Sequence, residues 1–349
     1  MKILHAADLH LDTPFTGRPP ILRQELLAVP GKLATLCKKE NCDIMLLSGD
    51  LFDGPHSKQS LDALRQALEE AAVPVFISPG NHDFCATDSP YLTAQWPKNV
   101  HIFTNPTISS LPLEALDCRI YGAGFRSMDC DALLEGFRAE GDEKYHIAIL
   151  HGDPTQLNSP YNPITGAQIR ESGLHYLALG HIHKTGSLRF GETLCAWPGC
   201  PMGRGWDELG PKGVLIVTID ATVDAEFVSL DCPQHHDIQI PGEDAQNALA
   251  ALLPAVGNGD HYRVTLTGEA TAPDLDALRS AFAHFPYLQL RDQTVPPVDI
   301  WSCVDSDSLE GVYFGILKNA AHQDDTRDIA TLAAKISRKI LDGQEVVLP

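Results

Sequence analysis

Five short segments of the sequence carry side chains that commonly bind metal ions. They are Asp8-Leu9-His10, Gly49-Asp50-Leu51-Phe52-Asp53, Gly80-Asn81-His82-Asp83, His151-Gly152-Asp153 and Gly180-His181-Ile182-His183. Their carboxylate, carboxamide and imidazole groups include no thiolate, a mixture that suits Mn²⁺ or Fe²⁺ and also admits Zn²⁺. Glycines beside several of these side chains allow the sharp turns that bring ligands close together. The five segments therefore predict a metal centre.

Each segment follows a short apolar run that is typical of a buried strand. The runs cover residues 3–4, 44–47, 75–77, 147–150 and 176–179. Between the second and third runs, apolar residues spaced by three and four over 61–71 predict a helix that stops at Pro74, which completes a βαβ unit. Loops at the carboxyl ends of neighbouring strands lie side by side, so we expect the five segments to converge on one crevice, as in an active site.

The remaining sequence indicates a second sheet and two further regions. After Lys184, apolar runs at 187–190, 194–197 and 214–219 follow one another without helices, which predicts a second sheet packed on the first with helices outside. We expect one domain over residues 1–231 and a small α/β domain over 233–297. Residues 303–349 show the pattern of two amphipathic helices. Their apolar stripes are Leu309, Val312, Tyr313, Ile316 and Leu317, then Ile329, Leu332, Ala333, Ile336 and Ile340.

The composition narrows the class of protein. A chain of 349 residues, of which 44% are apolar, exceeds what one core usually holds, so two or three domains are expected. The formal net charge of −20 excludes a protein that holds nucleic acid mainly through a general basic surface. Nine cysteines without a CxxC pair indicate reduced, cytosolic thiols. No signal sequence and no membrane-spanning stretch is recognisable, so we predict a cytoplasmic protein without a membrane partner.

The order of the five segments, DxH, GDxxD, GNHD, H and GHxH over residues 8–183, resembles the calcineurin-like metallophosphoesterase superfamily. Within it, the sequence is most similar to DNA repair exonucleases of the SbcD type, particularly their YhaO-like branch. Residues 5–15 (HAADLHLDTPF), 198–204 (PGCPMGR) and 210–213 (GPKG) carry this closer similarity. The resemblance implies an α/β fold in which a β-sandwich flanked by helices precedes a small α/β capping domain and C-terminal helices.

The resemblance also assigns the metal ligands. It implies two divalent ions that share the carboxylate of Asp50, with Mn²⁺ as the first candidate and Fe²⁺ or Zn²⁺ as alternatives. The implied ligands are Asp8, His10, Asp50 and His183 for one ion, and Asp50, Asn81, His151 and His181 for the other. The number of imidazoles is excessive for a single ion, which independently favours two. Such a pair lowers the pKa of a bridging water and neutralises phosphate charge during the attack.

His82 and Asp83 are the predicted catalytic residues. His82 is next to Asn81 but is not counted as a ligand, and it is the natural donor to the leaving oxygen. Asp83 is expected to orient His82 or to cap its loop, while Asp12 and Asp53 are candidates to hold the imidazoles from behind. Some relatives carry a histidine where this chain has Asp53. This chain therefore lacks that second active-site imidazole, and no role assigned to it in those relatives applies here.

Several other side chains have both a structural and a functional interpretation. His5 is expected to pack at the end of the first strand, and His235-His236 to lie in a solvated turn. Aromatic side chains at the rim could stack bases, although packing is their more common role: Phe125, Tyr161 and Trp206. Isolated basic residues are usually only solvated, but some are candidate phosphate contacts: Arg126, Lys184, Arg204 and Lys212.

Together these features favour a metal-dependent phosphodiesterase that acts on DNA as an exonuclease of DNA repair, with endonuclease activity left open. The resemblance implies an SbcC-like coiled-coil ATPase as the partner of the terminal helices and leaves a homodimer open. One alternative is a small-molecule phosphodiesterase or phosphomonoesterase of the same superfamily, which the acidic charge suits. Another is a non-catalytic subunit of an ATPase complex that keeps the metal site only for folding.

Overall fold

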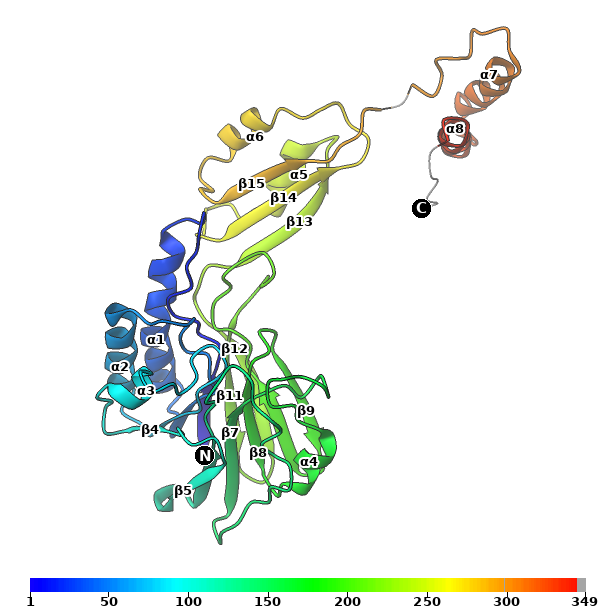
Figure 1. The fold of residues 1–349 in the computed structure, drawn as a ribbon. Helices are drawn as coiled ribbons and strands as arrows, with labels where there is room; N and C mark the ends of the chain where they lie inside the picture. The colour runs from blue at the N-terminus through cyan, green and yellow to red at the C-terminus, as the bar shows by residue number, and fades with distance from the viewer. Residues whose placement is uncertain (298, 344–349) are drawn as a thin grey trace. The chain divides into compact units, whose positions relative to one another are not determined.

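The structure is a computed structural model that describes residues 1–297 and 299–343. Contacts within the chain divide it into two compact units. The first comprises Met1–Asp237 with Asn258–Tyr262, and the second comprises Ile238–Gly257 with Arg263–Pro349. All five segments that carry candidate metal ligands belong to the first unit (Figure 1).

Two six-stranded sheets form the centre of the first unit. The first has the order β12-β11-β1-β2-β3-β4, and its strands are β1 (Lys2–Ala6), β2 (Ile44–Leu47), β3 (Val75–Ile77), β4 (Val100–Ile102), β11 (Gly213–Ile219) and β12 (Val223–Ser229). The second has the order β5-β6-β7-β8-β10-β9, and its strands are β5 (Ser109–Leu113), β6 (Cys118–Gly122), β7 (Tyr145–His151), β8 (Tyr176–Gly180), β9 (Gly186–Phe190) and β10 (Thr193–Trp197). Strands β1 to β4 are parallel, and so are β6, β7, β8 and β10.

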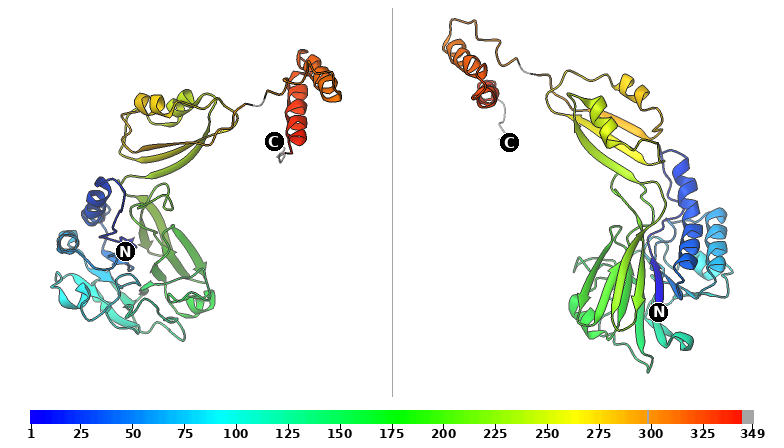
Figure 2. Two further views of the ribbon diagram at one scale, coloured as in Figure 1. Left: turned by 45° about the horizontal axis from the view of Figure 1, so that its top comes forward. Right: turned by 180° about the vertical axis from the view of Figure 1, so that it is seen from behind.

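Short connections and helices link these strands. The helices are α1 (Ile21–Lys39), α2 (Lys58–Ala71), α3 (Pro90–Thr93) and α4 (Gly166–Glu171), with a single 3₁₀ turn at Glu114–Leu116. The Ser57 side chain accepts a hydrogen bond from the backbone N–H of Ser60 and so caps the start of α2. Helices α1 and α2 cover the outer face of the first sheet, whose other face meets the second sheet (Figure 2).

Alternating side chains bury both faces of the central strands. On β2, Met45 and Leu47 pack with α1 and α2, whereas Ile44 and Leu46 pack between the two sheets. The strands β7 and β8 alternate in the same way between the inner core and a third cluster on the outer face of the second sheet. Burial on both faces explains why these strands read as continuous apolar runs.

The predicted sandwich with helices outside is confirmed, but the predicted division of its strands was partly wrong. Strands β7 and β8, expected in one layer with β1 to β3, belong to the second sheet, whereas β11 pairs antiparallel with β1 in the first. A continuous apolar run in the sequence indicates that a strand is buried. Which strand lies beside it depends on pairing between distant residues, such as Leu4 with Ile216.

The second unit contains most of a smaller sheet and two further pairs of helices. Strands β13 (His235–Pro241), β14 (His261–Thr267) and β15 (Leu288–Asp292) pair in that order, accompanied by α5 (Ala245–Leu252) and α6 (Leu275–Ala281). The chain then forms α7 (Leu309–Ala321) and α8 (Arg327–Leu341). Among the residues that the structure describes, no helix combines the length and the apolar character needed to cross a bilayer.

Helices α7 and α8 contact each other through a face that differs from the predicted stripe. Phe314 and Ala334 are fully buried and cluster with Ile300, although neither belonged to the stripes. Leu309 and Ile329, by contrast, are 88% and 73% exposed. Much of the predicted apolar stripe is therefore uncovered in the described part of the chain.

The prediction of a solvated turn at His235-His236 is wrong. His235 begins β13 and is fully buried, with its ring stacked on that of His261 at a centroid distance of 4.8 Å. The ring of Trp206 meets His235 edge-on at 5.1 Å. His236 Nε2 lies 2.9 Å from the Asp260 carboxylate. Partners distant in sequence, which local spacing does not reveal, make this position part of the interior.

Candidate metal centre

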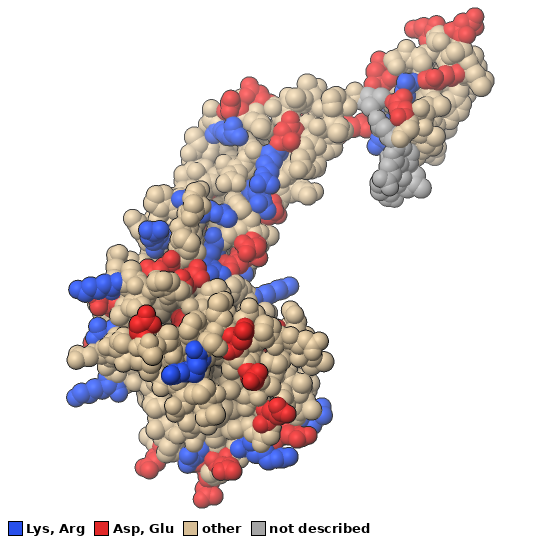
Figure 3. All heavy atoms as spheres, viewed as in Figure 1, with Lys and Arg blue, Asp and Glu red and all other residues tan. Residues whose placement is uncertain are grey.

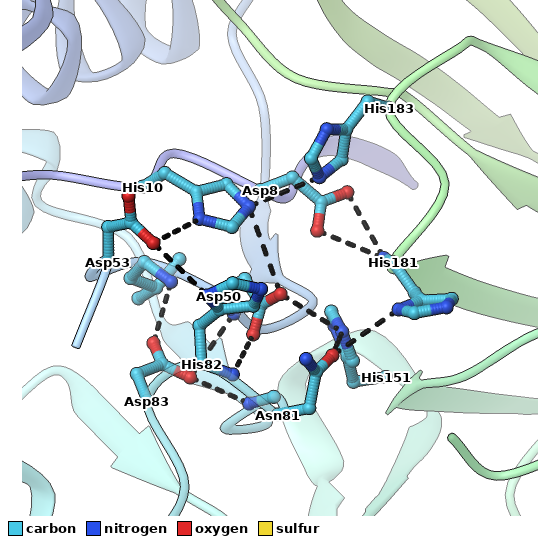
Figure 4. A network of polar contacts seen from close by, with 12 residues as sticks. Asp8, His10, Asp50, Asp53, Asn81, His82, Asp83, His151, His181 and His183 are labelled. Atoms are coloured by element: carbon cyan, nitrogen blue, oxygen red, sulfur yellow. Dashed lines mark hydrogen bonds and ion pairs between the residues drawn. The ribbon is translucent and has the colours of Figure 1, made fainter. Parts of the chain in front are cut away.

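The five segments converge at the carboxyl ends of strands from both sheets. Strands β1, β2 and β3 of the first sheet lead into three of them, and β7 and β8 of the second sheet lead into the other two. The side chains meet in one buried group (Figure 4). The crevice is therefore formed at the common edge of two sheets, instead of at a single sheet as predicted.

The backbone at this group is held in an uncommon conformation. Asp8, His10, Asp50 and His181 all have positive φ angles, of 53°, 47°, 51° and 91°. Side chains other than glycine rarely adopt this region, and such strain clusters at functional sites. Hydrogen bonds between loops maintain it: Asp8 N donates to Gly49 O at 3.0 Å and His10 N donates to Asp50 O at 2.9 Å.

Gly80 has a specific steric role beside these strained residues. A Cβ atom at this position would collide with the carboxylate and backbone of Asp50 and with the His151 ring. Only glycine therefore lets the loop after β3 approach the loop after β2 this closely.

Asp8, His10 and His183 form one half of the group. Each contributes a ligand atom to a set whose members all lie within 4.8 Å of one another. The Nε2 atoms of His10 and His183 face each other at 3.1 Å. Behind them, His183 Nδ1 lies 2.8 Å from Glu208 Oε1 and His10 Nδ1 lies 3.5 Å from Asp53 Oδ1. Carboxylates favour a proton on each Nδ1, which leaves two lone pairs pointing at each other and suits a shared cation.

Asn81, His151 and His181 form the other half. Asn81 Oδ1 lies 2.9 Å from His151 Nε2 and 3.3 Å from His181 Nδ1. His151 Nδ1 is 2.9 Å from the carbonyl oxygen of Ser48, to which it donates. This bond fixes the imidazole so that Nε2 points into the site, the arrangement usual for a metal-ligating histidine.

Asp50 lies between the two halves. Its Oδ2 atom is 3.8 Å from His10 Nε2 and 3.4 Å from His151 Nε2. Its Oδ1 atom accepts a hydrogen bond from the backbone N–H of His82 at 2.9 Å. A carboxylate with one oxygen between two sets of imidazoles has the position that a bridging ligand requires.

The charges of the group fit divalent cations. Asp8 and Asp50 are buried, and an ionised carboxylate in such a place needs positive charge nearby. Burial opposes ionisation of Asp50, but His151 and His10 outweigh it and hold the pKa of Asp50 well below its usual range. Burial likewise disfavours the charged form of His151, yet the charges of Asp50 and Asp8 raise the pKa of His151 to about 9. The site thus attracts a positive charge, which two cations would supply more effectively than a proton.

His82 lies beside the candidate metal ligands and is oriented by Asp53. Its ring is 42% exposed, and Nδ1 is 3.0 Å from Asp53 Oδ1. The contact with Asp53 raises the pKa of His82 despite partial burial. Asp53 also accepts a hydrogen bond from Thr13 Oγ1 at 3.1 Å, so this carboxylate holds both His82 and His10 from behind, as predicted for such a residue.

Asp83 stabilises the loop that carries Asp50. Its carboxylate accepts hydrogen bonds from the backbone N–H groups of Asp50 (3.2 Å), Leu51 (2.6 Å) and Gly80 (2.8 Å), and from the Tyr91 hydroxyl (2.5 Å). Of the two functions considered for Asp83, these contacts favour capping over orientation of the His82 ring. Asp12, the other residue considered as a support, accepts from the Ser57 backbone N–H at 2.8 Å and so fixes the start of α2.

Glu208 is a site residue that the sequence did not reveal. It is 4% exposed, and besides His183 it binds Arg204, whose backbone N–H donates to Glu208 Oε2 at 2.7 Å. Arg204, considered above as a phosphate contact, is therefore engaged by this carboxylate. No sequence motif at Glu208 indicates that it supports His183, because this contact depends on how the loop that carries Glu208 folds back on His183.

The aromatic candidates separate into packing and rim residues. Phe125 is buried with its ring edge-on to His151, which excludes it from base stacking. Tyr161 is partly exposed, and its ring centroid lies 4.8 Å from that of His181.

Two buried polar side chains support the loops around the site. Asn162 is fully buried and donates to the carbonyl oxygen of His151 at 2.8 Å. His5 is buried too, 2.7 Å from both the Tyr176 and Ser48 hydroxyls.

Residues 1–185 match the family described as calcineurin-like phosphoesterase, which covers more than half of the chain. The chain belongs to this family. It is therefore a hydrolase of the phosphoester class that contains candidate metal-binding residues. This confirms the superfamily indicated by the five motifs and the α/β sandwich that they implied.

Two curated relatives support the closer similarity to the SbcD and YhaO proteins. The uncharacterized metallophosphoesterase YhaO of Bacillus subtilis is 33% identical over 305 residues, which covers 78% of this chain and 73% of YhaO. The SbcD component of the nuclease SbcCD, also of Bacillus subtilis, is 24% identical over 259 residues, 62% of this chain and 66% of SbcD.

Solved structures with related arrangements include a dimetal phosphatase from Danio rerio and the protein TT1561 of Thermus thermophilus. The first is 11% identical with a TM-score of 0.45, covering 64% of this chain and 95% of the phosphatase. The second is 13% identical with a TM-score of 0.41, covering 65% of this chain and 98% of TT1561.

Proposed function

We propose that this chain is a phosphodiesterase that cleaves DNA with the help of two divalent cations, in first place Mn²⁺. The observation that carries the proposal is the position of Asp50, between two sets of ligands and next to His82. Asp8, His10, Asp50 and His183 would hold one cation, and Asp50, Asn81, His151 and His181 the other. When bound, such a pair activates a water molecule and neutralises phosphate charge.

His82 would act on the leaving oxygen of the substrate. Its Nδ1 faces the Asp53 carboxylate and donates to it, so in the doubly protonated ring the remaining proton, on Nε2, is available to the oxygen that departs from phosphorus. Asp53 holds the ring through Nδ1 and stabilises this charged form by raising the pKa of His82. Asp83 contributes as a positioning residue, because it holds the loop that carries Asp50.

DNA is preferred as substrate because the similar SbcD protein is named as part of a nuclease. The charge of the chain is the main argument for the alternative, a small phosphodiester or phosphomonoester. On the face visible in Figure 3, Lys and Arg side chains are interspersed with Asp and Glu, in keeping with the net charge of −20. Under the DNA proposal, affinity must come from the metal centre and from a partner.

An SbcC-like coiled-coil ATPase is the partner that we propose, in a cytoplasmic complex for DNA repair. The relative SbcD is named as one component of a two-component nuclease, SbcCD. Helices α7 and α8 supply exposed apolar side chains, including Leu309, Ile316 and Ile329, that a coiled coil could cover.

The test is a Mn²⁺-dependent assay of the purified chain on linear duplex DNA, single-stranded DNA and bis-p-nitrophenyl phosphate. We expect hydrolysis of the DNA substrates that chelation abolishes and that His82→Asn reduces on the order of a hundredfold. His284→Asn, a substitution at an exposed histidine of the second unit, serves as the control and should leave the rate unchanged. Hydrolysis of the small ester alone, with DNA left intact, would favour the alternative substrate class.

A further inference from the structure

A pocket of about 390 Å³ lies directly beside His82. Its walls include Phe52, Pro55, His56, His82, Phe84 and Asp88. His82 also belongs to a set with His10 and Asp50 whose ligand atoms all lie within 4.8 Å of one another. The same imidazole thus borders both the metal ligands and the pocket, so a group held in the pocket is adjacent to the reacting phosphate.

Hydrogen bonds to the rest of the first unit hold both walls of the pocket. On the wall that follows β2, Asp53 N donates to Leu11 O at 2.8 Å and Ser57 N donates to the Asp12 carboxylate at 2.8 Å. On the wall that follows β3, Cys85 N donates to Phe125 O at 2.8 Å. The pocket is therefore formed before a substrate arrives, as is usual for small-molecule sites.

The chemistry of the walls suits a neutral, flat ring. The partly exposed rings are those of His56 and Phe84, whereas Phe52, which is 1% exposed, belongs to the core with its ring centroid 5.6 Å from that of His56. Two carboxylates, the buried Asp83 and the exposed Asp88, also line the pocket. Their negative charge disfavours a further phosphate group. An uncharged ring with polar edges, by contrast, can stack on the partly exposed rings of Phe84 and His56.

From this geometry we infer that the pocket binds a nucleobase of the substrate. The base is the one whose sugar carries the leaving oxygen, because the pocket borders His82 and His82 faces that oxygen. The inference rests on the proposed phosphodiesterase function and adds the group that the enzyme recognises on the leaving side. A specificity for esters with a nucleoside leaving group follows from it.

The experiment uses the manganese-loaded protein and the dinucleotide thymidylyl-thymidine, with two analogues that each lack one base. The product that carries no phosphate identifies the leaving nucleoside. In the wild type, removal of the leaving-side base should lower kcat/KM on the order of tenfold, and removal of the other base should have little effect. In Phe84→Ala, the intact dinucleotide should be cleaved about tenfold more slowly, and removal of the leaving-side base should then cost less than twofold.

Leu92→Ala is the matched control. Leu92 is a 44% exposed apolar side chain on α3, close to Phe84 in sequence but not among the residues that line the pocket. This variant should retain the wild-type dependence on both bases. The thermal transition and the metal content of all variants check that the fold and the metal centre are intact.

Each possible outcome decides the inference. An equal loss in Phe84→Ala on all three substrates, or a wild type that is indifferent to the leaving-side base, overturns the base pocket while the phosphodiesterase function stands. A wild type that hydrolyses bis-p-nitrophenyl phosphate but none of the dinucleotides overturns the proposed substrate class, and the base pocket with it.

Discussion

Replacing Glu208 by Gln tests whether the carboxylate behind His183 supports the metal centre. Its side chain is 5% exposed, and its Oε1 atom lies 2.8 Å from His183 Nδ1. Burial disfavours its charge, but contacts with His183 and Arg204 hold the pKa of Glu208 well below its usual range. The group is therefore ionised, and Gln removes the charge while keeping the size of the side chain.

Two effects of different magnitude are expected. A carboxylate behind a metal-bound imidazole typically contributes 10- to 100-fold to metal affinity, so one of the two cations should bind about 10- to 100-fold more weakly. The substitution also leaves the Arg204 guanidinium, whose side chain is 15% exposed, without its counter-charge. Breaking a buried ion pair in this way costs about 3 kcal/mol, which for a unit of this size lowers Tm by about 6–12 °C.

The measurement is calorimetric titration of metal-free protein with Mn²⁺, together with thermal unfolding. The matched control is Glu143→Gln, which breaks the 2.7 Å pair between Arg119 on β6 and Glu143 in the loop before β7. That variant should lose some stability and bind both ions as the wild type does. If Glu208→Gln binds both ions within twofold of the wild type, the assignment of Glu208 as a support of His183 is refuted.

Four further outcomes follow from the structure. Asp50→Ala should lose both the second bound ion and hydrolysis. His82→Ala should retain both ions, as measured by elemental analysis, and hydrolyse about 10²- to 10⁴-fold more slowly. Two retained ions in Asp50→Ala would contradict a bridging role of Asp50. Burial lowers the pKa of His5 to about 3, so below pH 6.5 the unfolded chain binds a proton that the folded chain does not. In urea unfolding of the metal-free protein, the wild type should therefore lose about 2 kcal/mol of stability between pH 7 and 5 relative to His5→Gln. Identical pH profiles of the two proteins would exclude a buried neutral imidazole. The isolated protein should bind duplex DNA weakly, with a steep salt dependence only when a basic partner is present, and nanomolar binding at physiological salt would reveal a basic groove. A chain ending near Ser302 should stay folded, bind both metals and cleave a small phosphodiester without co-purifying with its ATPase; aggregation would show that α7 and α8 belong to the core of the protein itself.

The sequence by itself determined which side chains are candidate metal ligands and that a buried strand precedes each of the five segments that carry them. Asp8, Asp50 and Asn81 follow short strands that are buried on both faces, and such strands read directly from continuous apolar runs. Residue type then indicates the chemistry, because carboxylates, a carboxamide and imidazoles in this order match one family. These signals are local, so they can be recognised in the sequence without knowledge of the fold.

Tertiary structure decided which partners stand behind those ligands. Glu208 reaches His183 from a loop 25 residues away, and Asp53 rather than Asp83 meets the ring of His82. The placement of β7 and β8 in a second sheet, and the burial of His235, likewise depend on pairing between distant segments. A continuous apolar run records that a strand is buried, but the neighbours of a side chain, and for His235 its burial as well, are set by packing and strand register across the whole unit, which no short window of sequence contains.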